Sequence, residues 1–194
     1  MKFVDLAKYK FVMEPRYYFY GWSKSKKITG QEKLAKALAR ARKFLPAGYN
    51  FKIWDCQRSR AVQLKMIENI RRRFCAAYPR KSKKEIEKLV FTFAAKPKLR
   101  VTRPDCHRHG GAIHLTIVDK HGQELYMGTD FDDLTARAAL DYFEKKAVSV
   151  LDRACPPKPW RRREAQKNRR LLKKVLTQVG FENFAPEWWH WSIL

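Results

Sequence analysis

Apolar residues recur at helical spacing in the first half of the chain. The stretch TGQEKLAKALARARKFLPAGYN predicts a helix with Thr29 as its N-cap, and Pro46 ends the pattern. The stretches SRAVQLKMIENIRRRFCAAY and SKKEIEKLVFTFAA show the same period. They predict a helix that begins near Ser59 and another that is capped by Ser82.

Two more helices are expected in the second half. They are predicted over residues 132–151, DDLTARAALDYFEKKAVSVL, and residues 163–181, REAQKNRRLLKKVLTQVGF. Gly180 follows the last apolar position of the second stretch, as a glycine after a helix end often does. Between Pro97 and Pro104 we expect a loop or a short edge strand.

Strands are indicated by alternating or continuous apolar runs. YNFKIWD predicts a half-buried strand, and EWWHWSI predicts the last strand. GAIHLTIVDKHGQELYMGTDFDD predicts a strand, a turn at 120–123 and a returning strand that ends near Gly128. Helices and antiparallel strands in this order predict an α+β fold. We expect a single domain over residues 1–194, with a central antiparallel sheet and helices packed around it.

The charge of the chain points to its surroundings. Its 194 residues include 43 Lys and Arg against 19 Asp and Glu, for a formal net charge of +24. Such a charge favours an anionic neighbour, namely nucleic acid, a membrane surface or an anionic polymer. The basic runs lie mostly on predicted amphipathic helices, where charge is usually a solvated face, so nucleic acid is disfavoured.

The apolar runs and the cysteines bear on the compartment. No run approaches the roughly 20 apolar residues that span a bilayer, and the opening residues do not look like a signal peptide. We therefore expect a cytoplasmic protein without a membrane span. Its four cysteines show no CxxC spacing and are expected to be reduced. The sequence does not indicate an oligomeric state.

Candidate chemistry gathers in two short stretches. HRHGGAIH, residues 107–114, holds three of the five histidines, and EWWH adds Glu187 and His190. Hydrolytic zinc sites use three protein ligands, leave a position for water and keep a carboxylate nearby. Each stretch alone has an ordinary explanation: a solvated basic loop for the first, and an aromatic core strand with a satisfied histidine for the second.

Five segments, taken together and in order, carry a family resemblance over nearly the whole chain. They are RYYFYGWSKSKKITG, WDCQRS, DCHRHGGAIHLT, MGTDFD and EWWH. With these motifs the chain resembles the zinc D-alanyl-D-alanine dipeptidases, the group that includes the vancomycin-resistance dipeptidases. The resemblance implies a metallopeptidase that uses zinc to hydrolyse D-Ala-D-Ala or a similar D-configured dipeptide.

The resemblance also implies roles for single residues. His107 and His190 fall on two zinc ligands, and Glu187 falls on the general base that takes a proton from metal-bound water. Arg58 falls on the arginine that steadies the substrate carbonyl or its oxyanion. His114 falls on the third ligand, which is an aspartate in the family.

Four further positions are expected to contact substrate. Tyr17 and Asp132 fall on positions near the free amine, and Asp105 and Cys106, directly before the first ligand, are expected to line the pocket. Without the resemblance, Arg58 would be one surface cation among many and Asp132 a helix N-cap.

The histidine at the aspartate position leaves alternatives open. His114 either completes a three-histidine zinc site or fails to reach the ion. In the second case the metal and the activity are lost or reduced, and His109 is another candidate ligand. Two other functions also remain open. One is a DD-peptidase of the same fold that acts on peptidoglycan stem peptides. The other is a catalytically altered relative that binds an anionic cell-wall polymer through its basic surface.

Overall fold

The centre of the molecule is a mixed sheet of five strands in the order β2-β4-β5-β7-β6. The computed structural model describes residues 2–96, 103–145 and 157–193 of the chain. The strands span Val12–Met13 (β2), Asn50–Asp55 (β4), Ala112–Val118 (β5), Phe181–Asn183 (β6) and His190–Ile193 (β7). Strand β2 is parallel to β4 and the other neighbours are antiparallel. The expected antiparallel sheet is therefore correct except at its β2 edge.

Strand β5 lies in the middle of this sheet and carries part of the candidate chemistry. All of its residues are buried, as is typical of a central strand. Its register pairs His114 with Asp55 of β4 on one side and with His190 of β7 on the other. Directly opposite residues of an antiparallel pair point to the same face. Pairing therefore brings polar side chains from three distant segments to one level of the sheet.

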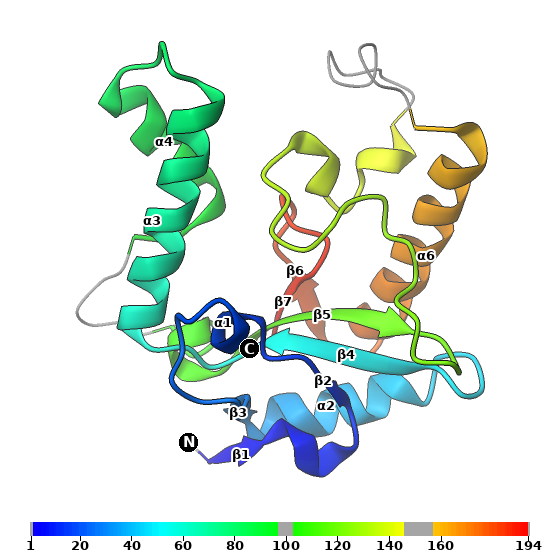
Figure 1. Cartoon of the computed structure of the whole chain (residues 1–194). Helices are drawn as coiled ribbons and strands as arrows, with labels where there is room; N and C mark the ends of the chain where they lie inside the picture. Colours follow the sequence, from blue (N-terminus) through cyan, green and yellow to red (C-terminus); the bar gives the residue numbers. More distant parts are fainter. Residues whose placement is uncertain (1, 97–102, 146–156, 194) are drawn as a thin grey trace.

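Helices surround the sheet and extend beyond one of its ends (Figure 1). In that view α2 lies beneath β4 and β5, α6 stands at one side, and α3 and α4 stand together at the other. A separate small sheet pairs β1 with β3. These elements span Phe3–Asp5 (β1), Arg16–Phe19 (α1), Thr29–Gln31 (β3), Glu32–Arg42 (α2), Arg60–Ala77 (α3), Lys83–Phe93 (α4) and Pro159–Thr177 (α6). The α+β class is confirmed.

The helix-start signals of α3 and α4 are confirmed. The Ser59 side chain accepts a hydrogen bond from the backbone N–H of Val62. Ser82 and Glu85 form a complete capping box at the start of α4. Both signals act within one helical turn, so no distant part of the chain competes with them.

The predicted cap of α2 is wrong. Thr29 belongs to strand β3, and the helix begins three residues later at Glu32. The Thr29 hydroxyl donates instead to the side-chain oxygen of Gln57, 2.8 Å away. Pairing of β3 with β1 extends the backbone at a position where the local sequence alone favours a helix start.

The helix predicted over residues 132–151 is also wrong in its described part, which ends at residue 145. Only two short 3-10 turns form there, Ala136–Ala138 and Tyr142–Glu144. The buried guanidinium of Arg169 donates to the backbone carbonyls of Arg137 and Ala139. These carbonyls would otherwise accept the hydrogen bonds of an α-helix, so a distant side chain prevents the helix.

Helix α6 also binds the segment predicted to return as a strand. The turn forms as expected, with the Asp119 carboxylate accepting from the backbone of residues 121 and 123. Beyond a single bridge between Val118 and Glu124, residues 124–128 form no strand. Asn168 and Arg169 of α6 bind the carbonyls of residues 126 and 127 instead.

Three other expectations have a structural outcome. Gly180 follows α6 with a φ of +92°, as expected of a glycine after a helix end. Cys56, Cys75 and Cys106, the cysteines in the described residues, are free thiols. In the same part of the chain, no helix is long and apolar enough to cross a membrane. The loop or strand expected between Pro97 and Pro104 falls mostly outside the described residues.

Replacing Arg169 tests whether this buried side chain holds the segment from 127 to 139. We expect Arg169→Met to lower the free energy of unfolding by about 3 kcal/mol or more, because three carbonyls lose their buried donor. Arg170→Met is the matched control, since Arg170 is exposed and within the described residues pairs with Glu144, which predicts a change of about 0–1 kcal/mol. Equal losses of unfolding free energy in the two variants, measured by chemical denaturation, would show that Arg169 does not hold this segment.

Candidate metal centre

Three histidines from two parts of the chain meet at the sheet. His114 and His190 face each other across the β5–β7 pair, and His107 lies in a 3-10 turn just before β5. The turn depends on its two glycines. Gly110 has a φ of +66°, and a Cβ on Gly111 would lie 2.0 Å from the carbonyl oxygen of Pro104. The glycines therefore let the chain fold back so that His107 lies over β5.

The ring nitrogens of these histidines converge. His107 Nε2 and His114 Nε2 are 3.0 Å apart, and His114 Nε2 and His190 Nδ1 are also 3.0 Å apart. All three nitrogens lie within 4.8 Å of one another, the arrangement of a group that could hold a metal ion. His109 is not part of this cluster, although it lies in the same turn.

Burial keeps two of the imidazoles neutral. It lowers the pKa of His107 to about 4 and that of His114 well below the ordinary value, and the neighbouring charges of Arg58 and the other histidines act in the same direction. Neutral imidazole is the form that ligates metals. His107 and His114 are thus held in the protonation state that binds metals at neutral pH.

Hydrogen bonds around the cluster orient the lone pairs. His107 Nδ1 lies 2.6 Å from the carbonyl oxygen of Cys56, which only accepts, so Nδ1 carries the proton and Nε2 presents a lone pair to the cluster. His114 Nε2 has a single site for a proton yet faces two nitrogens at 3.0 Å. One proton cannot bridge both contacts well, whereas a cation satisfies all three nitrogens. The residues present therefore fit a metal ion.

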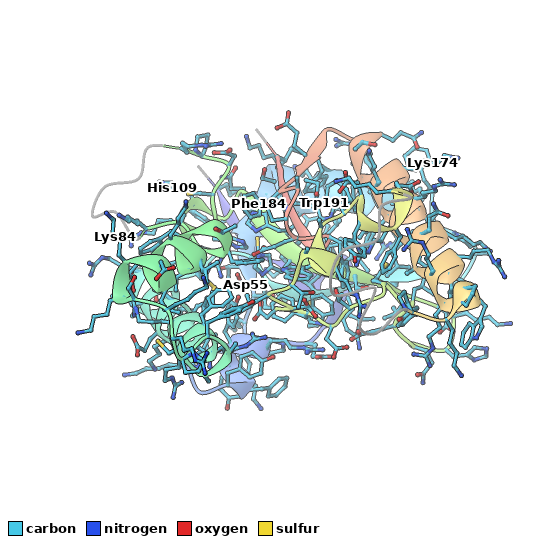
Figure 2. The ribbon with its side chains drawn as sticks, turned by 90° about the horizontal axis from the view of Figure 1, so that it is seen from above. Asp55, Lys84, His109, Lys174, Phe184 and Trp191 are labelled. Atoms are coloured by element: carbon cyan, nitrogen blue, oxygen red, sulfur yellow. The ribbon has the colours of Figure 1, made fainter. Side chains whose placement is uncertain are left out.

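Asp55 supports the cluster from behind, a role that the sequence did not indicate. Its Oδ2 lies 3.1 Å from His107 Nδ1 and 3.5 Å from Arg58 Nε, and its side chain is nearly buried. Figure 2 shows Asp55 near the middle of the molecule, between the α3–α4 side and the α6 side. A carboxylate behind a ligating histidine fixes the ring and raises its basicity.

Glu187 lies beside the cluster on the opposite side. Its Oε2 is 3.3 Å from His190 Nδ1 and 4.0 Å from His114 Nε2. Asn183 holds this turn, because its amide nitrogen donates to the carbonyls of both Glu187 and His190. Asn183 is a second residue that the sequence did not single out, since nothing in its local pattern distinguishes it.

Arg58 is buried next to the histidines and is not a surface cation. Its backbone N–H donates to the carbonyl of His107, and its Nη1 donates to the Tyr17 hydroxyl at 3.1 Å. Tyr17 is only 3% exposed. Tyr17 lines a small hollow of about 120 Å³ on the far side of Arg58 and is not among the residues that line the main cleft. Its hydroxyl accepts from Arg58 and donates to the Met66 sulfur.

The other expected residues line one open cleft of about 610 Å³. Those residues are Arg58, Asp105, Cys106, His107, His114, Asp132, Glu187 and His190. The cleft is bounded by the start of α3 and the end of α4 on one side and by β6 and β7 on the other. The structure therefore brings every expected site residue into one cleft except Tyr17, which lies behind Arg58.

Three of these residues have surroundings that bear on their roles. Arg103 binds the Asp105 carboxylate through two nitrogens, which lowers the pKa of Asp105. The Cys106 thiol donates to the Arg103 carbonyl. Asp132 has a φ of +60°, and the short 3-10 turn that comes next is capped by Thr135, so Asp132 is not an N-cap. Burial, followed by the negative charge of Glu187, raises the pKa of Asp132 to about 7.

Fold and site define a class: an α+β protein with a buried three-histidine centre, an adjacent glutamate and an arginine in one cleft. A family model described as D-ala-D-ala dipeptidase matches residues 20–194. The chain belongs to the D-Ala-D-Ala dipeptidase family.

Curated relatives agree with this assignment at low identity. D-alanyl-D-alanine dipeptidase of Synechocystis is 27% identical over 151 residues, which cover 72% of this chain and 58% of the relative. The Escherichia coli protein of that name is 34% identical over 93 residues, 48% of this chain and 40% of its own length. The Enterococcus faecium protein is 28% identical over 172 residues, which cover 86% of this chain and 74% of the relative. The chain thus spans 58% and 40% of the first two relatives.

The elevated pKa of Asp132 predicts a pH dependence of stability. Between its ordinary value of 3.8 and about 7, the folded protein holds a proton on Asp132 that the unfolded chain releases. Stability from this group is therefore present at low pH and is lost as the pH rises through that window, by up to about 1.4 kcal/mol per pH unit. Asp132→Asn removes the dependence, and asparagine tolerates a positive φ.

Chemical denaturation of the metal-free protein checks this pH dependence. The measurements run from about pH 4.5 to 7.5, roughly the window in which Asp132 titrates. The difference in unfolding free energy between wild type and Asp132→Asn should fall steadily with rising pH. All other groups are the same in both proteins, so their contribution cancels in the difference. A difference that stays constant with pH would show that Asp132 is not perturbed.

Proposed function

We propose that this chain, residues 1–194 acting as one metallopeptidase domain, is a zinc-dependent hydrolase of D-Ala-D-Ala or a similar D-configured dipeptide. The observation that carries the proposal is the convergence of His107, His114 and His190 beside Glu187 in the cleft. Membership in the D-Ala-D-Ala dipeptidase family supports the same substrate class.

Zinc suits this donor set. Three imidazole nitrogens with no carboxylate or thiolate among them are a common zinc ligand set in hydrolytic sites. His107, His114 and His190 would hold the ion, and Asp55 and Cys56 would orient the first of them. When bound, zinc supplies a Lewis acid that polarises a carbonyl oxygen and makes water more acidic.

Glu187 is the proposed general base. Its carboxylate oxygen lies next to the ligand nitrogens, so a water molecule near the cluster is within its reach. Glu187 would take a proton from that water as the peptide carbonyl is attacked, and it would pass the proton to the leaving amine. Asn183 fixes the backbone at this position through its bonds to the carbonyls of Glu187 and His190.

Arg58 is proposed to stabilise the negative charge that develops on the carbonyl oxygen. It is buried, always protonated, and lines the cleft beside His107. Tyr17 and Asp55 contact it from behind and restrict its position. A donor fixed in place before the reaction stabilises the transition state more than a mobile one, because no reorganisation is needed.

Asp132 is proposed to recognise the free ammonium group of the dipeptide, and Asp105 and Cys106 to line the pocket near His107. An ammonium group next to Asp132 would favour its ionised form, and the ion pair would then replace the proton that the empty cleft retains. Tyr17 acts in this proposal as a positioning residue for Arg58, because it has no place in the main cleft.

The cleft also supports a second candidate substrate, a peptidoglycan stem peptide with a D-amino-acid bond. Its volume of about 610 Å³ is within the roughly 300–1,000 Å³ of pockets that take drug-sized ligands. That is more than a dipeptide of two alanines requires. Comparing the cleavage of free D-Ala-D-Ala with that of a stem pentapeptide separates the two candidates.

Glu187→Gln tests the proposed chemistry directly. With zinc loaded, we expect kcat for alanine release from D-Ala-D-Ala to fall at least about 100-fold, the typical contribution of a general base. Zinc content should stay at one equivalent, because the three histidines are unchanged. Glu164→Gln, an identical change on the exposed face of α6, is the matched control and should keep the wild-type rate.

Two outcomes contradict the proposal. Full activity in Glu187→Gln would exclude Glu187 as the base. Wild-type protein that holds zinc but releases no alanine from the dipeptide or the stem peptide would exclude peptidase function. It would favour the alternative in which an altered relative binds an anionic cell-wall polymer.

A further inference from the structure

One wall of the cleft carries a group of positively charged side chains that the proposed chemistry does not use. We call this group the cationic wall; its members are Arg60, Lys96, Arg103 and Arg108. All four line the cleft and are exposed to solvent. They come from the start of α3, the residues after α4, and the segment around the first histidine.

Hydrogen bonds of the backbone and side chains bring these segments together. The N–H of Arg58, two residues before Arg60, donates to the carbonyl of His107, the neighbour of Arg108. The Gln63 amide on the first turn of α3 donates to the carbonyl of Ala95, next to Lys96. The cationic wall is therefore a structured feature of the cleft and not a chance set of surface residues.

The wall holds more positive charge than its own segments neutralise. Asp105 is the acidic residue that these segments contribute to the cleft, and its carboxylate is already bound by Nε and Nη2 of Arg103. Arg60 and Arg108 form no ion pair within the described residues, and the Lys96 ammonium lies over the Phe91 ring. Several donors are thus left facing the cleft.

The opposite side of the cleft carries the reverse charge. Glu182 and Glu187 come from β6 and the turn before β7, and Asp132 comes from the segment after residue 128. Figure 1 shows β6 and β7 across from α3 and α4, while the Asp132 carbonyl accepts a hydrogen bond from Arg73 of α3. A peptide whose ammonium group lies at Asp132 would extend its C-terminal residue toward the cationic wall.

We propose that the cleft selects peptides with an acidic side chain in the residue on the C-terminal side of the scissile bond. The C-terminal carboxylate of a neutral dipeptide can engage only part of the wall. A second carboxylate in the same residue would meet the remaining cations, and the cleft has room for it. This inference rests on the proposed peptidase function.

The high net charge of the chain does not by itself account for this wall. Basic side chains are spread over the molecule, and Figure 2 shows Lys84 and Lys174 at opposite ends of it. Such exposed cations face bulk solvent, where a single charge is screened. Those of the cationic wall share one cleft with the candidate metal centre, where several of them can act on one ligand.

Two dipeptides of nearly equal shape test the inference: D-Ala-D-Glu and its neutral isostere D-Ala-D-Gln. For the zinc-loaded wild type we expect kcat/KM to be about tenfold higher for D-Ala-D-Glu at low salt, mainly through a lower KM, and the ratio to shrink with added salt. In the double variant Arg60→Glu and Arg108→Glu, the ratio should fall to one or below.

The matched control changes the same net charge elsewhere. Arg163→Glu with Lys167→Glu alters two exposed positions of α6, which do not line the cleft, and should keep the wild-type ratio. Equal rates for the two peptides in wild type would overturn the inference and leave the peptidase function intact. An equal drop of the ratio in both double variants would reduce the effect to net charge and would also overturn it. If neither these peptides nor D-Ala-D-Ala is cleaved, the proposed function itself fails.

Discussion

The pairing of β5 with both β4 and β7 is the constraint on which the rest of the site depends. It sets His114 opposite Asp55 and His190 at once, although these residues are 59 and 76 positions away along the chain. A shift of the register by one residue would turn His114 to the other face of the sheet. The Gly-Gly turn then adds His107 and, through its carbonyl, the backbone of Arg58.

Burial of this cluster has a cost that a cation offsets. Three imidazoles have converging nitrogens, and burial of His107 and His114, whose pKa values are lowered, leaves lone pairs with little contact with water. Glu187 lies beside the converging nitrogens and Asp55 lies behind His107, so two carboxylates are close to the place where positive charge is needed. The same burial that makes the empty site unfavourable makes electrostatic interactions strong when the site is filled.

Local signals in the sequence predicted what local forces decide. The caps at Ser59 and Ser82 and the central strand around His114 are formed as expected. Resemblance to the dipeptidases identified the residues that now share one cleft. The helix expected after Asp132 failed because the Arg169 side chain, distant in sequence, takes the carbonyls it would use. The supporting contacts of Asp55 and Asn183, and the place of Tyr17 behind Arg58, arise from tertiary packing that no local spacing encodes.

The central proposal is that His114, which the resemblance places at an aspartate position of the dipeptidases, is a working metal ligand. Crystals grown with zinc, with anomalous diffraction measured on both sides of the zinc absorption edge, test it most directly. The account predicts one strong anomalous peak about 2.0–2.1 Å from His107 Nε2, His114 Nε2 and His190 Nδ1 together. A peak bound by His107 and His190 while His114 lies out of reach, or no peak at the cluster, would contradict it.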